Sequence, residues 1–280
     1  MMLSYLRRNI SLVVGVLLIS SLLVFALVGR LVWDVDLASP LAAPANQPPT
    51  AEHPLGTDRQ GRDLLAVMIE ATPSTLYIGL LAGFIGVAIG TALALFGAYY
   101  GGGVDTAIRG VVDVGLTLPP LLILILVAIS VQGGLNVSQM ALVVASLSWL
   151  WPARTIRSQV LTIKERAYIQ VARLSGAGPL RIIFTEILPN LLPYLAATFV
   201  GSVAAAILAA IGLEVIGLGP IEANTLGVTL YWVGYYSALL HGMWWWFMPP
   251  VVIIIILFIG LFSISSGLDE LANPRRRRVV

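Results

Sequence analysis

Residues that commonly carry catalytic chemistry are scarce in this sequence. It has no cysteine, so it offers no thiolate nucleophile, no disulfide and no cysteine ligand for a metal ion. The two histidines, His53 and His241, lie far apart, and neither has a second histidine or cysteine at ligand spacing. The only lysine, Lys164, does not stand in a phosphate-binding loop. The sequence therefore predicts a chain that is not an enzyme and binds no metal ion or other cofactor itself.

Two carboxylates, Asp113 and Glu214, lie next to long uncharged stretches. A charged group inside a membrane is costly and is therefore a candidate for function. Either residue could line a pore. Both are also near the ends of predicted helices, where headgroups and water can solvate them, so a place at the membrane surface is the alternative interpretation.

A third group of polar residues lies between positions 53 and 63, in the segment His-Pro-Leu-Gly-Thr-Asp-Arg-Gln-Gly-Arg-Asp. Its charged side chains can form local ion pairs, and its glycines allow tight turns. Either Thr57 or Asp58 could cap a helix that begins near Gln60. The residues of interest are His53, Gly56, Thr57, Asp58, Gly61, Arg62 and Asp63. Residue types alone favour a structural loop.

The longest polar and basic stretch runs from Pro152 to Pro189. An apolar stripe at helical spacing passes through it at Ala167, Val171, Leu174 and Leu180. Gly176, Gly178 and Pro179 interrupt this stripe. We therefore expect a short helix, a turn and a second helix, a compact shape that suits a docking surface. A solvated connector without a partner is the alternative.

The elements that must position these residues are membrane helices. The 280 residues are 58% hydrophobic and only 11% charged, with a mean hydropathy of +0.93, which a soluble domain rarely reaches. About 20 apolar residues cross a hydrocarbon core of roughly 30 Å. The crossings expected are Ile10–Gly29, about Thr75–Tyr99, two helices between Asp113 and Arg154 broken at 132–136, about Pro189–Leu218, and about Trp244–Leu268. We expect Pro119-Pro120 to kink the third helix, and 223–240 to be an external amphipathic or re-entrant helix.

The basic residues orient these six crossings. If both termini lie in the cytoplasm, every lysine and arginine except Arg30, Arg59 and Arg62 falls on the cytoplasmic side, as the positive-inside rule requires. The net charge of +2 is too small to suggest nucleic acid as a partner. The run Arg275–Arg278 is instead expected to lie beside anionic lipid of the cell membrane.

Small residues in the second apolar run recur at intervals of three, four or seven. They are Gly79, Gly83, Gly86, Gly90, Gly97 and Gly101. This spacing places them on one helical face, and such a face lets two helix backbones approach closely in lipid. Packing within the chain is the first expectation, and a subunit contact or a pore lining is the alternative.

Two segments resemble those of a known family. The stretch 152–190 is similar to the cytoplasmic loop of ABC importer permeases, whose pattern is Glu-Ala-Ala, three residues, Gly, nine residues, then Ile-x-Leu-Pro. The corresponding residues here are Gln170-Val171-Ala172, Gly176 and Leu188-Pro189, with Gln170 replacing the Glu and Glu186 replacing the first Ile. Residues 53–63 resemble the His-Pro-Leu-Gly-Thr-Asp-x-x-Gly-Arg-Asp signature of the second permease in dipeptide, oligopeptide and nickel importers.

The resemblance implies a type I ABC importer permease fold, an all-α polytopic membrane protein with six transmembrane helices and cytoplasmic N- and C-termini. Residues 1–70 would hold the first helix and an extracytoplasmic loop, and 71–280 the remaining five helices with the coupling loop 152–190. The coupling residues implied are Tyr168, Gln170, Val171, Ala172, Arg173, Gly176, Ala177, Leu188 and Pro189.

The partners implied by the resemblance are a second homologous permease chain, two ATPase subunits that bind ATP and Mg²⁺, and an extracytoplasmic substrate-binding protein, which residues 53–63 could touch. The implied function is import of short peptides across the cytoplasmic membrane by alternating access, with oligosaccharides or nickel as alternative substrates. A secondary transporter driven by an ion gradient is the rival from another class. It would need polar groups at mid-membrane and often an internal repeat, and neither is clear here.

Overall fold

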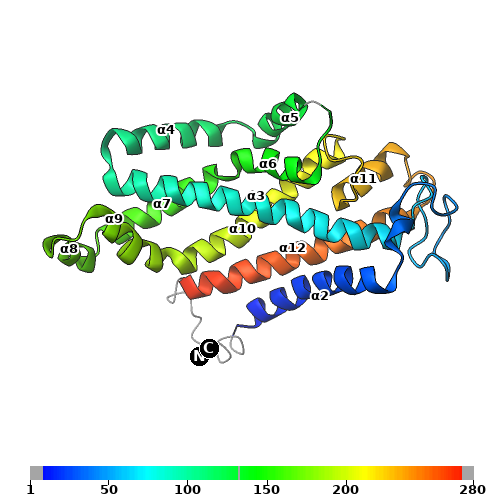
Figure 1. Cartoon of the computed structure of the whole chain (residues 1–280), viewed down its shortest axis with the longest axis horizontal. Helices are drawn as coiled ribbons and strands as arrows, with labels where there is room; N and C mark the ends of the chain where they lie inside the picture. The colour runs from blue at the N-terminus through cyan, green and yellow to red at the C-terminus, as the bar shows by residue number, and fades with distance from the viewer. Residues whose placement is uncertain (1–8, 132, 273–280) are drawn as a thin grey trace.

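The computed structural model describes residues 9–131 and 133–272 as one elongated helical bundle (Figure 1). Within these residues the only β-pairing is an isolated bridge between Thr57 and Asp63. The elements are α2 (Ile10–Val32), the 3₁₀ turn η1 (Val35–Ala38), α3 (Leu64–Tyr100), α4 (Gly102–Thr117), α5 (Pro120–Ser130), α6 (Val137–Ser148), α7 (Leu150–Lys164), α8 (Ala167–Leu174), α9 (Pro179–Arg181), the π-helical η2 (Ile182–Ile187), α10 (Leu188–Val215), α11 (Leu226–Tyr235) and α12 (Trp244–Ala272). In Figure 1, α8 lies at one end of the bundle, and the loop after α2 lies at the other with α11.

Four helical segments are long and apolar enough to cross a membrane. They are α2, α3, the continuous stretch Pro179–Val215 that ends in α10, and α12. The pair α4 and α5 would make a fifth if it counts as one bent span. The bend between them is 93° and falls at Leu118 and Pro119. This confirms the predicted kink, because a residue that precedes proline disfavours the helical conformation.

Two helices begin earlier than the sequence predicted. The second crossing starts at Leu64 instead of near Thr75, and the third starts at Gly102 instead of near Asp113. In both, charged residues that seemed to lie outside the helix have partners. Glu70 accepts a hydrogen bond from Asn224 (2.8 Å), and Asp105 pairs with Arg157 (Nε to Oδ1, 2.6 Å). Such pairing lowers the free-energy cost of placing a charged side chain in a membrane helix. The sequence does not reveal these partners, because they lie far away along the chain.

The helix after residue 136 begins where the turn cluster predicted. Asn136 and Gln139 form a reciprocal capping box at the start of α6. Only Trp149 separates α6 from α7, and its backbone is itself in the right-handed helical region (φ −83°, ψ −19°). The path from Val137 to Lys164 is therefore close to continuous.

Helix α3 is the centre of the bundle, and its glycine face is where other helices approach. Gly79 and Gly83 lie against Ile207 and Val203 of α10, and Gly86 lies against the carbonyl of Ser148. Gly90 lies against Pro152 and Ala153 of α7. The predicted role of these four glycines in packing within the chain is confirmed. Gly97 faces α4, and Gly101 ends α3 with a positive φ of 69°.

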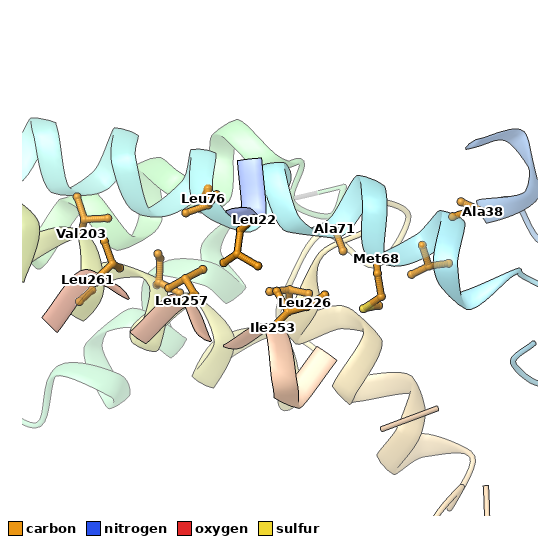
Figure 2. Packing of buried hydrophobic residues seen from close by; sticks show 14 residues of the cluster. Leu22, Ala38, Met68, Ala71, Leu76, Val203, Leu226, Ile253, Leu257 and Leu261 are labelled. Atoms are coloured by element: carbon orange, nitrogen blue, oxygen red, sulfur yellow. The ribbon is translucent and has the colours of Figure 1, made fainter. Parts of the chain in front are cut away.

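The largest apolar cluster joins α3 to four other helices and to η1 (Figure 2). Met68, Ala71 and Leu76 of α3 contribute to it. The labelled partners in Figure 2 are Leu22 of α2, Val203 of α10, Leu226 of α11, and Ile253, Leu257 and Leu261 of α12, with Ala38 of η1. This cluster occupies the half of α3 that is nearer to the loop after α2.

Helices α2 and α12 form an antiparallel pair at the edge of the bundle (Figure 1). Gly15 lies against the backbone of Gly260, and Gly267 lies against Leu12. Asn9 caps α2 by accepting from the Leu12 N–H (3.1 Å) and donates to the Gly267 carbonyl (3.1 Å). The start of α2 is thus held at the end of α12.

The aromatic segment near residues 223–240 contains α11, which packs along the outer part of α3. The Leu226 N–H at the start of α11 donates to Thr75 of α3 (3.0 Å), whereas Val233 near its end shares an apolar cluster with Leu64. By the rise of a helix, Thr75 lies about 16 Å along α3 from Leu64. Helix α11 therefore begins inside the bundle and runs outward along α3.

The close approach at Gly86 leads to the first prediction. Replacing Gly86 with valine would place a methine carbon 2.6 Å from the Ser148 carbonyl oxygen, so α3 and α6 must separate. We expect a loss of about 1–3 kcal/mol of folding free energy, measured as a lower Tm of the purified protein. The matched control is Gly110→Val on α4, where nothing lies within 4 Å. Equal Tm values for the two variants would show that the approach is not tight.

Candidate functional site

The predicted helix–turn–helix is present between α7 and α10. Helix α8 is fixed to the bundle by Ile169, which is fully buried. Ile169 packs among apolar residues of α3, α7, η2 and α10, namely Ala94, Leu95, Ala98, Ile156, Val160, Ile182, Ile183, Ile187 and Leu191. The sequence prediction missed Ile169, because the stripe that it followed lies on another side of the helix.

That stripe is exposed. Leu174 is 89% exposed and Val171 is 60% exposed, and Tyr168 lies beside them on the outer surface of α8. Gln170, Arg173, Gly176 and Pro189 are also exposed, whereas Ala172, Ala177 and Leu188 are half-buried. The predicted coupling residues thus divide into an outer group, centred on Val171 and Leu174, and an inner group that holds α8 in place.

The turn after α8 explains the glycine at position 176. Gly176 has a φ of +81° and donates its N–H to the Arg173 carbonyl (3.0 Å). The N–H of Ala177 donates to the Ala172 carbonyl (3.0 Å). These two bonds form the Schellman motif, which requires a left-handed residue after the helix. Glycine adopts that conformation without the strain that a side chain would cause.

Basic residues at this end of the bundle bind the ends of helices. The Lys164 ammonium donates to the carbonyls of Ala98 (3.0 Å) and Tyr99 (2.7 Å), the last turn of α3. Lys164 and Arg173 both lie over the Tyr99 ring, at 5.7 Å and 5.4 Å from its centre. Helices α3, α7 and α8 therefore meet at one aromatic ring.

At the opposite end, the segment 53–63 is folded around two buried carboxylates. Asp58 accepts from the N–H groups of Gln60 (2.8 Å) and Arg62 (2.9 Å) and pairs with the Arg62 side chain (2.6 Å). Gly56 and Gly61 have positive φ angles, as turns there require. The predicted local ion pair and tight turns are confirmed.

Asp63 is the N-cap of α3. Its Oδ1 accepts from the N–H of Ala66 (2.8 Å) and from the Trp33 indole (3.2 Å), and its Oδ2 pairs with His53 (2.8 Å). The expectation that Thr57 or Asp58 caps a helix near Gln60 is wrong. The Thr57 hydroxyl instead donates to the Pro44 carbonyl (2.6 Å), and the helix begins at Leu64.

The two candidate pore carboxylates differ in their exposure to solvent. Asp113 is exposed on α4. Glu214 is buried at the end of α10, where its carboxylate lies against Gly227 at the start of α11. Neither residue lines the cavity described next. Among the described residues, no three histidine, aspartate or glutamate side chains are grouped so that they could hold a metal ion.

A cavity of about 600 Å³ lies between α4, α5, α6, α7, α10 and α12. Its walls are mostly apolar side chains, interrupted by hydroxyl groups and one carboxylate. The polar lining residues are Ser148, Thr155, Tyr194, Thr198, Ser202, Ser265 and Asp269. Tyr194, Thr198 and Ser202 follow each other at four-residue spacing on α10, so they form a polar stripe on an otherwise apolar helix. The sequence prediction missed this stripe, although its four-residue spacing is a local signal.

Residues 86–278 match the family model described as "Binding-protein-dependent transport system inner membrane component". The match covers well over half of the chain, including the cavity, α8 and the Schellman turn. The chain belongs to this family. It is therefore a multi-pass membrane protein and a transport subunit, and the family match supports the predicted ABC permease over the secondary transporter.

Curated relatives of this family member include two peptide permeases. The oligopeptide transport system permease protein OppC of Mycobacterium tuberculosis (strain ATCC 25618 / H37Rv) is 32% identical over 173 residues, 62% of this chain and 60% of that protein. The matched part of the chain thus spans about three fifths of that relative's length. The dipeptide transport system permease protein DppC of Bacillus subtilis (strain 168) is 29% identical over 98% of this chain and 84% of its own length.

A solved structure shares the fold. A chain from inward-facing conformations of the MetNI methionine ABC transporter superposes with a TM-score of 0.58 at 18% sequence identity. The match covers 75% of this chain and 97% of that chain. The fold is therefore that of an ABC importer permease, as the resemblance implied.

The buried cap at Asp63 supplies the second prediction. Asp63→Ala removes the N-cap of α3 and leaves the Trp33 indole and His53 without their shared acceptor. We expect a loss of about 2–4 kcal/mol, seen as a Tm lower by at least about 5 °C in detergent. Glu52→Ala, at an exposed position of the same loop, should leave the Tm unchanged. A normal Tm for Asp63→Ala would mean that this cap does not hold the loop.

Proposed function

We propose that this chain is one permease subunit of an ATP-driven importer, and that the importer moves short peptides into the cell by alternating access. The observation that carries the proposal is α8, a helix with an exposed apolar surface that is held rigidly at one end of the bundle. The names of the two relatives, an oligopeptide permease and a dipeptide permease, support peptides as the substrate.

The proposed topology has six crossings with both termini in the cytoplasm. The crossings are α2, α3, the bent pair α4 and α5, the nearly continuous α6 and α7, the stretch that ends in α10, and α12. Basic residues gather at the α8 end, which supports a cytoplasmic position for that end. They are Arg109, Arg154, Arg157, Lys164, Arg166, Arg173 and Arg181.

In this proposal the outer face of α8 binds an ATPase subunit. Val171 and Leu174 are apolar side chains in water when the chain is alone, so covering them is favourable. Ile169 and the Tyr99 contacts connect α8 to α3 and α7, and movement of the ATPase would therefore reach the central helix of the bundle. ATP and Mg²⁺ would bind to two ATPase subunits, since Lys164 has no phosphate-binding loop around it.

The other two proposed partners, a second permease and a substrate-binding protein, are assigned to different parts of the bundle. A second homologous permease would complete the substrate path, and the hydroxyl-lined cavity of about 600 Å³ is our candidate for this chain's share of it. Hydroxyl groups can bind peptide N–H and carbonyl groups of many sequences. A substrate-binding protein would meet the opposite end, which carries the loop of residues 33–63 (Figure 1).

The docking role of α8 gives the third prediction. Leu174→Asp should weaken ATPase binding at least about tenfold and abolish peptide-stimulated ATP hydrolysis, because a carboxylate would be buried in an apolar contact. The Tm of the permease should not change, since Leu174 is 89% exposed.

The matched control for ATPase binding is Leu41→Asp, because Leu41 is 90% exposed but lies in the loop after α2, far from α8. Binding is measured by co-purification of the ATPase subunits, and coupling by ATP hydrolysis in proteoliposomes. Full ATPase binding and stimulation in Leu174→Asp would contradict the proposal.

A further inference from the structure

The turn between α11 and α12 is closed by backbone hydrogen bonds, yet two of its leucine side chains are exposed. Its backbone is closed by hydrogen bonds from Ala238 to Val233 (3.0 Å) and from Gly242 to Leu239 (3.1 Å). Ala238 is buried in an apolar cluster that also holds Leu64, Met243 and Trp246. Leu239 and Leu240 point away from this cluster and are 59% and 89% exposed.

No charged residue lies near this turn in the sequence. Between Glu222 and Asp269 the chain contains no aspartate, glutamate, lysine or arginine. Two exposed leucines are unfavourable in water. The polar groups beside them are Ser237 and His241, both exposed in the turn, and the Arg59 guanidinium, 5.4 Å from the centre of the Tyr236 ring. Lipid headgroups can solvate such polar groups while the leucines enter the apolar layer.

The packing of α2 against α12 fixes the level of the turn. Residues of α2 and α12 are in contact in an antiparallel register, one residue forward along α2 for one residue backward along α12. The contacts that show it are Leu12 with Gly267, Gly15 with Ile264 and Ile19 with Gly260. If this register continues, the last residue of α2, Val32, lies level with the first turn of α12. Both helices therefore reach the same boundary together, and that boundary is where Trp244 begins α12.

This boundary coincides with the edge of the apolar part of the bundle. The uncharged part of α12 runs from Trp244 to Leu268, which is about 37 Å of helix against a hydrocarbon core of roughly 30 Å. Exposed apolar side chains follow one side of it. They are Trp244, Met248, Val252, Ile255, Ile259 and Phe262. Trp244 thus continues a lipid-facing stripe, at the depth where tryptophan is enriched in membrane proteins.

We propose that the turn Ser237–Met243 is a membrane anchor, which inserts Leu239 and Leu240 into the headgroup–acyl boundary of the lipid leaflet beside Trp244. The Trp244 N–H donates to the Gly242 carbonyl (2.9 Å), so the turn stays next to the start of α12 and cannot extend far into water. The anchor holds the outer end of α11 at a fixed depth. The inference requires that α2 and α12 cross a membrane, and it does not depend on peptide import.

The absence of cysteine from the sequence makes the test direct. Single-cysteine variants of the full-length chain are spin-labelled in vesicles of phosphatidylethanolamine and phosphatidylglycerol. Collision rates with oxygen, which concentrates in lipid, and with a nickel chelate, which stays in water, are then compared. Leu240→Cys is the test position, and Leu239→Cys repeats it if the first variant does not fold.

Two reference positions complete the experiment. Val252→Cys lies on the exposed stripe of α12 and reports lipid, and Glu52→Cys lies on the exposed loop and reports water. We expect the oxygen-to-nickel ratio at Leu240 to be several-fold above that at Glu52 and to approach that at Val252.

A ratio at Leu240 equal to that at Glu52 would overturn the anchor, and so would a label shielded from both reagents, which would mean that protein covers the turn. A water-like value at Val252 would overturn the crossing by α12 and the anchor with it. Peptide-stimulated ATP hydrolysis, measured on the same variants, separates failure of the anchor from failure of the proposed import.

Discussion

The structure depends on how closely other helices approach α3. In lipid, the hydrophobic effect does not hold apolar helices together, so association depends on close packing of backbones. Gly79, Gly83, Gly86 and Gly90 provide that approach along one face, and α10, α6 and α7 lie against it. These are the helices that carry the polar stripe of the cavity and lead into α8. The glycine face thus determines where both parts of the candidate site lie.

Charged residues hold the two ends of this bundle. At one end, Asp58 and Asp63 organise the loop before α3. At the other end, Lys164 caps α3, and the Asp105–Arg157 pair joins α4 to α7. Because these groups satisfy one another, the ends of the helices keep their relative positions. Helix α8 is therefore held against helices whose ends are fixed. A helix that transmits movement from a partner must be held in this way.

Features set by local sequence were predicted well. The kink at Pro119, the turn at Gly176 and the glycine packing face each depend on a few neighbouring residues. The starts of α3 and α4, the anchor Ile169 and the environment of Glu214 were not predicted correctly. Each depends on a contact with a residue far away in sequence, such as Asn224 with Glu70, that no single stretch of sequence reveals. The stripe of Tyr194, Thr198 and Ser202 could have been found, because its four-residue spacing is local.

The proposed coupling requires α8 to face the cytoplasm, where ATP is hydrolysed. The most direct test is labelling of single cysteines at Ser175, in the turn after α8, and at Glu52, in the loop after α2, with a maleimide that does not cross membranes. Both residues are exposed, so labelling depends on the side of the membrane. We expect Glu52→Cys to be labelled in intact cells and Ser175→Cys to be labelled only after the membrane is opened. Labelling of Ser175→Cys in intact cells would contradict the proposed coupling.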